Sequence, residues 1–126
     1  MITLKLISNM DTSEISQSNK LINTYFDNNR FNDYKSAILY KKNNTIVGFI
    51  GIYDNLLNQI CTDINYRREG IATEMINTCK KLLKGKISLF IDKNKKNTNY
   101  LLHFYQKNNF NIELENEVEY KMSYKK

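Results

Sequence analysis

The chain has 126 residues, of which 41% are hydrophobic and 25% charged, and its formal net charge is +6 with a pI near 9.2. This length is typical of one domain around one hydrophobic core, so residues 1–126 are predicted to fold as a single unit. The composition excludes a disordered chain, and no apolar run reaches the roughly 20 residues of a membrane-spanning helix. The first residues also lack the pattern of a signal peptide, so we expect a cytoplasmic protein with no membrane partner.

Strand and helix patterns alternate in the first half of the chain. Residues 3–7 read as a strand, and Asp11 to Ser13 can cap a helix that runs to about Phe26. Residues 27–33 are polar and read as a loop or a short helix. Three antiparallel strands are then predicted at 36–41, 45–53 and 56–63, because the turns between them contain asparagine and aspartate. The segment 45–53 is almost entirely apolar, which predicts a central strand covered on both faces.

The second half begins with a helix and ends with a hairpin. From Gly70 the apolar residues recur at helical spacing, and we expect Leu82 on the buried stripe and Gly85 at the end of the helix. A strand at 87–91 follows, and then a helix at 97–108 with Tyr100, Leu101 and Phe104 directed inward. Residues 110–114 and 118–124 are predicted to form a final hairpin. The expected fold is therefore α/β (α+β), with a mixed, mainly antiparallel central sheet flanked by helices.

Neither the two cysteines nor the positive charge identifies a binding partner. Cys61 and Cys79 lie in an apolar strand and on an apolar helix face without a CxxC spacing, so buried thiols are expected and no metal site or disulfide is. The net charge favours anionic partners, but the lysines are dispersed over several loops. A small basic nucleic-acid binder is an alternative, yet the aromatic residues lie at core spacing and no basic stripe is evident, so no nucleic acid is expected.

Residues 63–73, DINYRREGIAT, predict an anion-binding site. An apolar strand ends there, a basic turn with Gly70 follows, and an amphipathic helix begins. The first amides of a helix have no intrahelical acceptor and the helix dipole adds positive charge, so bare backbone at Gly70 can receive a diphosphate. Arg67 and Arg68 add two full charges.

Two motifs in this order resemble those of a known family. Arg67-x-x-Gly70-x-Ala72 is similar to the R/Q-x-x-G-x-G/A signature of the GNAT superfamily, the acetyl-CoA-dependent N-acetyltransferases. FYQKNNF at 104–110 resembles the second motif of the family, FYxKxGF, and the required helix and strand lie between the two. The resemblance covers about residues 36–112 and implies a compact single-domain GNAT with acetyl-CoA as its cofactor.

The resemblance also assigns roles to particular residues. It implies that main-chain groups of Ile60, Cys61 and Thr62 pair with pantetheine, and that Tyr105 protonates the departing thiolate. Asn97 would contact pantetheine, with Thr98 or Asn99 as alternatives. Six residues at the turn and the helix start would hold the diphosphate through their amides: Arg68, Glu69, Gly70, Ile71, Ala72 and Thr73.

The sequence departs from the family pattern at several positions. Arg68 and Asn109 stand where glycine is common, and asparagine tolerates the positive φ that such a position requires. Glu69 places a negative charge near the expected phosphates. No acidic residue lies in strands 56–62 or 87–91, where family members often carry a general base.

The residues therefore leave the identity of the general base open. Water-mediated deprotonation, Asp63, Asp92 or the terminal hairpin are the alternatives, and the alternating glutamates of that hairpin are more simply solvated charge: Glu113, Glu115, Glu117 and Glu119. His103 is expected to be a packing or surface residue, and Cys61 a core residue instead of an acetyl carrier.

The resemblance implies that the protein transfers acetyl from acetyl-CoA to a primary amine by direct attack, with Tyr105 as general acid. The acceptor cannot be identified from the sequence, and a polyamine-like molecule and a protein or peptide amine both fit. The alternative is a GNAT relative that binds CoA or a protein partner without catalysis. The exposed edge of the terminal hairpin would also permit a homodimer.

Overall fold

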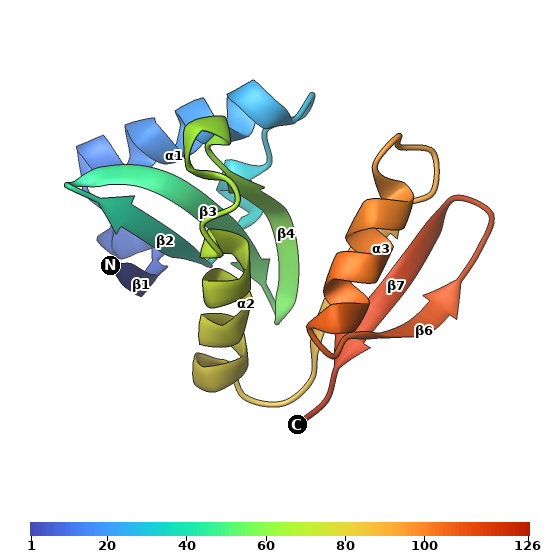
Figure 1. The fold of residues 1–126 in the computed structure, drawn as a ribbon. Helices are drawn as coiled ribbons and strands as arrows, with labels where there is room; N and C mark the ends of the chain where they lie inside the picture. Colours follow the sequence, from blue (N-terminus) through green and yellow to red (C-terminus); the bar gives the residue numbers. More distant parts are fainter.

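The computed structural model describes residues 1–126 as one seven-stranded sheet with three α-helices (Figure 1). The strands are β1 (Ile2–Leu6), β2 (Ser36–Lys42), β3 (Thr45–Tyr53), β4 (Leu56–Thr62), β5 (Ile87–Asp92), β6 (Asn111–Glu115) and β7 (Glu119–Tyr124). The α-helices are α1 (Thr12–Tyr25), α2 (Ile71–Leu82) and α3 (Thr98–Lys107), and short 3-10 turns are η1 (Ile7–Asn9), η2 (Phe31–Asp33) and η3 (Ile64–Tyr66). The predicted fold class is confirmed.

The sheet is continuous in strand order but divided in the middle. The order is β1-β2-β3-β4-β5-β7-β6, and every neighbouring pair is antiparallel except β4 and β5. These two parallel strands share a single paired position, Leu56 with Ser88. Beyond that pair the strands diverge, and β4 keeps a free edge (Figure 1).

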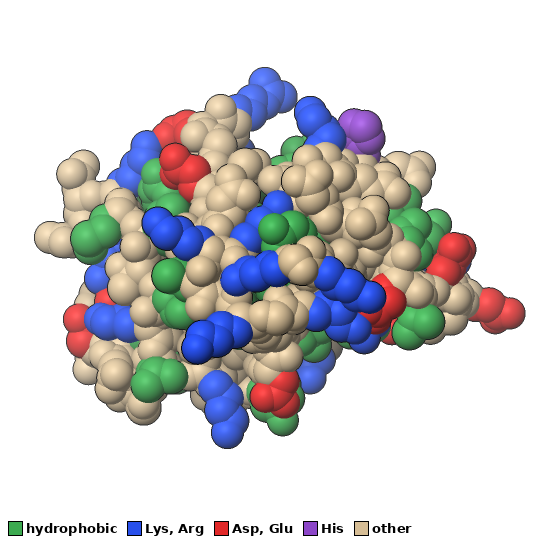
Figure 2. Space-filling model, turned by 90° about the horizontal axis from the view of Figure 1, so that it is seen from below, with side chains coloured by type: hydrophobic (Ala, Val, Ile, Leu, Met, Phe, Trp, Pro, Cys, Tyr) green, Lys and Arg blue, Asp and Glu red, His purple; other side chains and the backbone are tan.

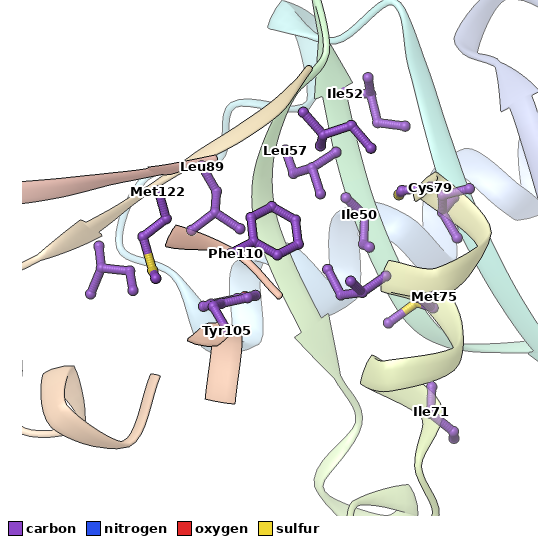
Figure 3. Packing of buried hydrophobic residues seen from close by; sticks show 14 of the residues in the cluster. Ile50, Ile52, Leu57, Ile71, Met75, Cys79, Leu89, Tyr105, Phe110 and Met122 are labelled. Carbon is purple, nitrogen blue, oxygen red and sulfur yellow. The ribbon is translucent and has the colours of Figure 1, made fainter. Parts of the chain in front are cut away.

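The helices cover both faces of the sheet. α1 packs on one face of β3 and β4, whereas α2 packs on the opposite face of β2 to β4 and α3 packs against β5 (Figure 1). Strand β3 is buried at seven of its nine residues because both faces are covered, which confirms its predicted central position. The larger core cluster joins α2 and α3 through Met75, Tyr105 and Phe110 (Figure 3).

Two predicted core residues are exposed. Leu82 is 49% exposed, because α2 ends there and Leu83 turns into extended backbone, so the helix ends before Gly85. Gly85 instead takes a φ of +78° in the turn that leads to β5. Tyr100 is 70% exposed, because the buried face of α3 is formed by residues such as Tyr105, which lies five positions later. Both predictions of inward packing were wrong.

Two lysines at the lower end of the molecule serve the fold. Figure 2 shows Lys and Arg side chains across the middle of this face, where Figure 1 places the end of α2 and the C-terminus. The ammonium of Lys80 donates to the carbonyl of Asn108, and that of Lys126 to the carbonyl of Leu83. Cations at carbonyl groups of helix ends complement the helix dipole, so part of the positive charge is structural.

The terminal hairpin carries ion pairs instead of one free acidic face. Glu113 contacts Lys86 and Lys121, and Glu115 contacts Lys93. The strand is irregular between Ile112 and Leu114, which breaks the alternation of the glutamates. Both cysteines are buried free thiols, as predicted. None of the helices combines the length and the apolar character needed to span a membrane.

Helix α1 is fixed to the sheet by one buried carboxylate. Asp11 and Glu14 form a capping box, and Glu14 also accepts hydrogen bonds from the ammonium groups of Lys5 and Lys41, each at 2.7 Å. These bonds to the two lysines hold the pKa of Glu14 at about 2, below its ordinary 4.5. The carboxylate therefore joins α1 to β1 and β2.

We expect Glu14→Gln to lower the free energy of unfolding by about 1.5–3 kcal/mol at pH 7, since it removes hydrogen bonds to charged groups. The contribution of ionised Glu14 is complete above pH 4.5 and is lost as the pH falls from 4.5 towards 2. Urea unfolding at pH 7 and pH 2.5 measures both effects. Glu117→Gln, at an exposed glutamate, is the control and should change stability by less than about 0.5 kcal/mol. Equal effects of the two variants would contradict this role of Glu14.

Candidate functional site

A cavity with a volume of about 670 Å³ opens where β4 and β5 diverge. We call it the interstrand cavity. It brings together the end of β4, the loop before α2, the first turn of α2 and one face of α3. Its lining residues are Ile60, Cys61, Thr62, Tyr66, Arg67, Arg68, Gly70, Ile71, Ala72, Thr73, Asn97, Tyr100, Leu101, Phe104 and Tyr105. All the sequence-predicted site residues except Glu69 line it.

The free edge of β4 presents main-chain groups to this cavity. Strands β3 and β4 pair Phe49 with Cys61, and the amide of Asp63 donates to the carbonyl of Val47 at 2.8 Å. Because hydrogen bonding alternates along an antiparallel pair, the groups of Cys61 face β3, while those of Ile60 and Thr62 face the gap. The main-chain groups of Ile60 and Thr62 are therefore free to pair with an extended ligand.

The loop before α2 owes its shape to two left-handed residues. Gly70, the N-cap of α2, has a φ of +77°, and Arg68 has a φ of +69°. The common glycine at the position of Arg68 thus has a conformational reason, and arginine there costs about 1–2 kcal/mol. A Cβ atom on Gly70 would meet nothing within 4 Å, so the backbone stands open. The first amides of α2 point into this opening, which is suited to an anion.

Arg67 is held in place by the elements around it. Its Nε donates to the carbonyl of Thr62 at 3.1 Å, and its guanidinium lies 4.9 Å from the ring centre of Tyr25 on α1. The hydroxyl of Tyr25 in turn accepts from the amide of Ile64 at 2.8 Å. Arg67 therefore ties the loop to α1 and also places a positive charge at the cavity.

Glu69 does not present an unpaired negative charge. Its carboxylate forms an ion pair with Lys42 at the end of β2, and the Lys42 ammonium lies 5.6 Å from the ring centre of Tyr66. The carboxylate raises the pKa of Lys42. Sequence reasoning missed Lys42, because 27 residues separate the pair and no local pattern connects a hairpin lysine with this loop.

Tyr105 lies at the inner wall of the cavity. It is only 6% exposed and packs edge-on against Phe104 and Phe110, with ring centres 5.1 and 5.9 Å away. Figure 3 shows Tyr105 beside Phe110. Burial raises the pKa of its phenol well above the ordinary value of 10. The phenol therefore stays protonated at neutral pH. The left-handed turn at Asn109, with a φ of +69°, ends α3 as predicted and leads to Phe110.

The remaining candidate residues, on and before α3, differ in their positions and contacts. Asn97 is the N-cap of α3 and lines the cavity, Asn99 is exposed, and the hydroxyl of Thr98 donates to the carbonyl groups of Asp92 and Lys95. His103 is exposed.

The carboxylates proposed as bases are engaged in local turns. Asp63 accepts from the amide of Asn65, and Asp92 accepts from the amide of Asn94. Neither lines the cavity. Burial raises the pKa of the Cys61 thiol to about 12, so this cysteine is a poor nucleophile at neutral pH.

Comparisons with known proteins agree with this geometry. The model of a family described as "Acetyltransferase (GNAT) domain" matches residues 18–112, which is most of the chain. The chain belongs to the GNAT acetyltransferase family. The GNAT match includes both motifs on which the resemblance rested, and no curated protein sequence matches the chain.

Solved GNAT structures share the whole fold at low sequence identity. An acyl-CoA N-acyltransferase from Pseudomonas aeruginosa is similar with a TM-score of 0.77 and 11% identity over 98% of this chain and 97% of the other. Arabidopsis thaliana Naa50, in complex with the bisubstrate analogue CoA-Ac-MVNAL, is similar with a TM-score of 0.71 and 19% identity over 99% of each chain. The ribosomal-protein-S18-alanine N-acetyltransferase from Escherichia coli is similar with a TM-score of 0.70 and 13% identity over 99% of this chain and 94% of the other.

Proposed function

We propose that this GNAT protein is an acetyl-CoA-dependent N-acetyltransferase that acts on a primary amine. The observation that carries the proposal is the interstrand cavity, which holds an anion-binding helix start, a free strand edge and a buried phenol in one continuous space. Each part meets one requirement of acetyl-CoA: a site for the diphosphate, a partner for the amide-containing pantetheine arm, and a proton donor for the thiolate. The CoA named in the Naa50 structure supports this reading.

The residues of the loop and of α2 would hold the diphosphate. The amides from Arg68 to Thr73 surround the open backbone at Gly70, and Arg67 and Arg68 supply positive charge. The pantetheine arm would extend the sheet at β4 by pairing with Ile60 and Thr62, with Asn97 on the opposite wall. These are the predicted positions, except that the main chain of Cys61 belongs to the pair with β3.

The reaction would be direct transfer. The neutral amine attacks the thioester carbonyl and forms a carbon–nitrogen bond, and the collapse of the tetrahedral intermediate breaks the carbon–sulfur bond. Tyr105 would protonate the departing sulfur, the attacking nitrogen would lose one proton to water, and the phenolate of Tyr105 would regain a proton from water. A strand amide near Thr62 would stabilise the oxyanion. Products are an amide and CoA.

Calorimetric titration with acetyl-CoA, followed by thiol release in the presence of amines, tests this function. We expect micromolar binding and amine-dependent release of CoA. Binding without amine-dependent release over a broad panel of acceptors would support the non-catalytic alternative. A folded protein that does not bind acetyl-CoA would contradict the acetyltransferase function and a CoA-binding role, and would leave the protein-interaction alternative.

The ion pair of Lys42 with Glu69 gives a further prediction. We expect Lys42→Met to weaken acetyl-CoA binding about 5- to 10-fold, because it leaves the carboxylate of Glu69 uncompensated beside the diphosphate site. Calorimetry measures the dissociation constant.

The double variant Lys42→Met with Glu69→Gln is the matched control. Removal of both charges should restore most of the affinity, since the penalty comes from the unpaired carboxylate. If the double variant binds as weakly as Lys42→Met alone, Lys42 acts on the cofactor directly and not through Glu69.

A further inference from the structure

Lysines gather at the lower end of the molecule in Figure 1, opposite the loop before α2. This end is formed by the last turns of α2 and α3, the loop that leads to β5, the start of β2 and the residues after β7. We call it the basic end, and its lysines are Lys35, Lys80, Lys81, Lys84, Lys86, Lys107, Lys125 and Lys126. Figure 2 shows this face of the molecule, with Lys and Arg side chains across its middle. The function proposed above uses none of these lysines.

The fold brings these lysines together from several segments of the chain. As described above, two lysine ammonium groups tie the end of α3 and the C-terminal residues to the end of α2. The side-chain amide of Asn55 donates to the carbonyl of Lys84 at 2.5 Å, which places the loop before β5 beside the turn between β3 and β4. The backbone amide of Lys35 donates to the carbonyl of Ile52 at 3.1 Å, next to the same turn. The sequence shows no basic stripe, because the cluster forms only when these segments meet.

The basic end carries the whole formal net charge of the protein. Two acidic residues lie among the eight lysines: Asp54 in the turn between β3 and β4, and Glu113 on β6. Asp33, at the margin, is paired with Arg30. Eight lysines against two acids give +6, which equals the net charge of the chain, so the basic and acidic residues elsewhere balance at eleven each. The electrostatic field of the protein is therefore one-sided and attracts anions to this end.

Five of the eight lysines have no partner within the protein. Two of the others donate to carbonyl groups, and Lys86 forms an ion pair with Glu113. The five without a hydrogen bond or ion pair of the side chain are all exposed: Lys35, Lys81, Lys84, Lys107 and Lys125. The helix dipole favours lysines in the last turns of α2 and α3, but Lys35, Lys84 and Lys125 lie outside the helices. Like charges at this density repel one another, and an anionic partner would relieve the repulsion.

The side chains at this end fit phosphate better than a protein or a bilayer. All eight cations are lysines, which bind phosphate as point charges, and none offers the planar fork with which arginine binds a carboxylate. The exposed large aliphatic side chains here, Leu6 and Leu82, belong to different elements. A protein interface is built around an apolar core with aromatic anchors, and an interfacial membrane helix needs a whole apolar face. The basic end has neither feature.

The aromatic residues favour a duplex over a single strand. Proteins that bind single strands stack the bases on several aromatic side chains. Tyr53 is the one exposed aromatic ring at this end, and Lys80 lies over the rings of Phe110 and Tyr124 at 5.7 and 4.6 Å from their centres. A duplex needs no stacking surface, because it hides its bases and presents about one phosphate charge per 1.7 Å of its axis.

From these observations we infer that the basic end binds the phosphate backbone of a nucleic-acid duplex without sequence specificity. The lysines without a protein partner contact phosphates, and the release of counterions supplies most of the affinity. Helix α2 begins at the loop of the interstrand cavity and ends at the basic end, and its 12 residues span about 18 Å. The duplex and acetyl-CoA therefore bind at separate places. Duplex binding does not depend on the acetyltransferase activity proposed above.

Fluorescence anisotropy with labelled DNA and RNA duplexes of about 20 base pairs tests this binding. We expect a dissociation constant of about 10⁻⁶–10⁻⁴ M at physiological salt. It should rise about 40- to 500-fold between 50 and 200 mM KCl, which corresponds to three to five phosphate contacts. Two unrelated sequences should bind within threefold of each other, and tighter binding of DNA or RNA identifies the preferred duplex. Failure to bind either duplex, or binding that salt does not weaken, overturns the inference.

A triple variant tests whether the basic end is the binding surface. Lys81→Gln, Lys84→Gln and Lys125→Gln together should weaken duplex binding at least 30-fold at 50 mM KCl and lower the slope of the logarithmic salt dependence by about 2–3. The control variant loses the same charge by glutamine substitution of three exposed lysines on α1 and in the loop before α3: Lys20, Lys95 and Lys96. It should bind the duplex within threefold of the parent. Equal losses in the two variants would show that net charge alone drives binding and would overturn the inference.

Competition and other anionic surfaces separate the remaining explanations. Saturating acetyl-CoA should change the affinity for the duplex less than twofold, and displacement of the duplex would place it at the arginines of the interstrand cavity instead. Binding to vesicles with 30% phosphatidylserine or to polyglutamate, without binding to either duplex, would assign the basic end to a membrane or an acidic protein. The triple variant should keep the melting temperature and the acetyl-CoA affinity of the parent. If the parent binds the duplex but not acetyl-CoA, the proposed function fails and duplex binding stands.

Discussion

Gly70→Asp is expected to weaken acetyl-CoA binding at least 30-fold. The substitution places a carboxylate on open backbone at the start of α2, where the diphosphate would bind. Two like charges about 5 Å apart at an effective dielectric constant of 20 repel by about 3 kcal/mol, so one added charge suffices for this loss. Calorimetric titration of the variant against the parent protein gives the ratio of dissociation constants.

Gly70→Asn is the matched control for this charge. Asparagine has the same size as aspartate and tolerates the φ of +77° at this position about equally well, so it introduces the same backbone strain without the charge. We expect its affinity for acetyl-CoA to stay within about fivefold of the parent. If the Asn variant lost as much affinity as the Asp variant, strain in the loop and not repulsion of the diphosphate would explain the result. Unchanged affinity in both variants would place the diphosphate elsewhere.

The second large effect is expected at Tyr105. Tyr105→Phe should lower kcat about 100-fold, since a positioned general acid contributes roughly 10²–10⁴-fold. The dissociation constant of acetyl-CoA should change less than twofold, because the ring that packs against Phe104 and Phe110 is retained. Because burial raises the pKa of this phenol, we also expect no loss of its proton between pH 6 and 9. Steady-state rates and calorimetry measure both quantities.

Tyr120→Phe serves as the control for loss of a phenol. Tyr120 packs against the same core from β7 but does not line the interstrand cavity, so the variant should keep kcat within twofold. A kcat of Tyr105→Phe close to that of the parent would show that water, and not Tyr105, protonates the leaving thiolate.

The missing acidic residue on the central strands has a consequence for the pH dependence of any activity. With no carboxylate or histidine lining the interstrand cavity, the amine itself would limit the rate at low pH. Such a dependence would differ from that of an enzyme with a dedicated base in the cavity.

Local sequence patterns were enough to predict the elements and the outline of the site. Alternation and helical spacing placed all seven strands and three α-helices, because each element must bury an apolar face and its period is visible in the sequence. The motif around Gly70 predicted a turn with bare backbone at the start of a helix, since these requirements are local. The cap at Asp11 and the turn at Asn109 were predicted for the same reason. Local patterns failed at Leu82 and Tyr100, where the exact end or rotation of a helix depends on its neighbours.

The contacts between segments distant in the chain depend on the tertiary structure alone. Lys42 neutralises Glu69, Tyr25 supports Arg67, and Gln59 fixes the segment that begins at Asn28. Each partner is an ordinary residue in its own segment, so no spacing or composition marks it. The bulge at Gln59 and the single pair between β4 and β5 likewise depend on how strands from different parts of the chain meet. A sequence records what each segment can form, whereas the charge balance of the loop and the opening of the sheet arise only when the segments pack together.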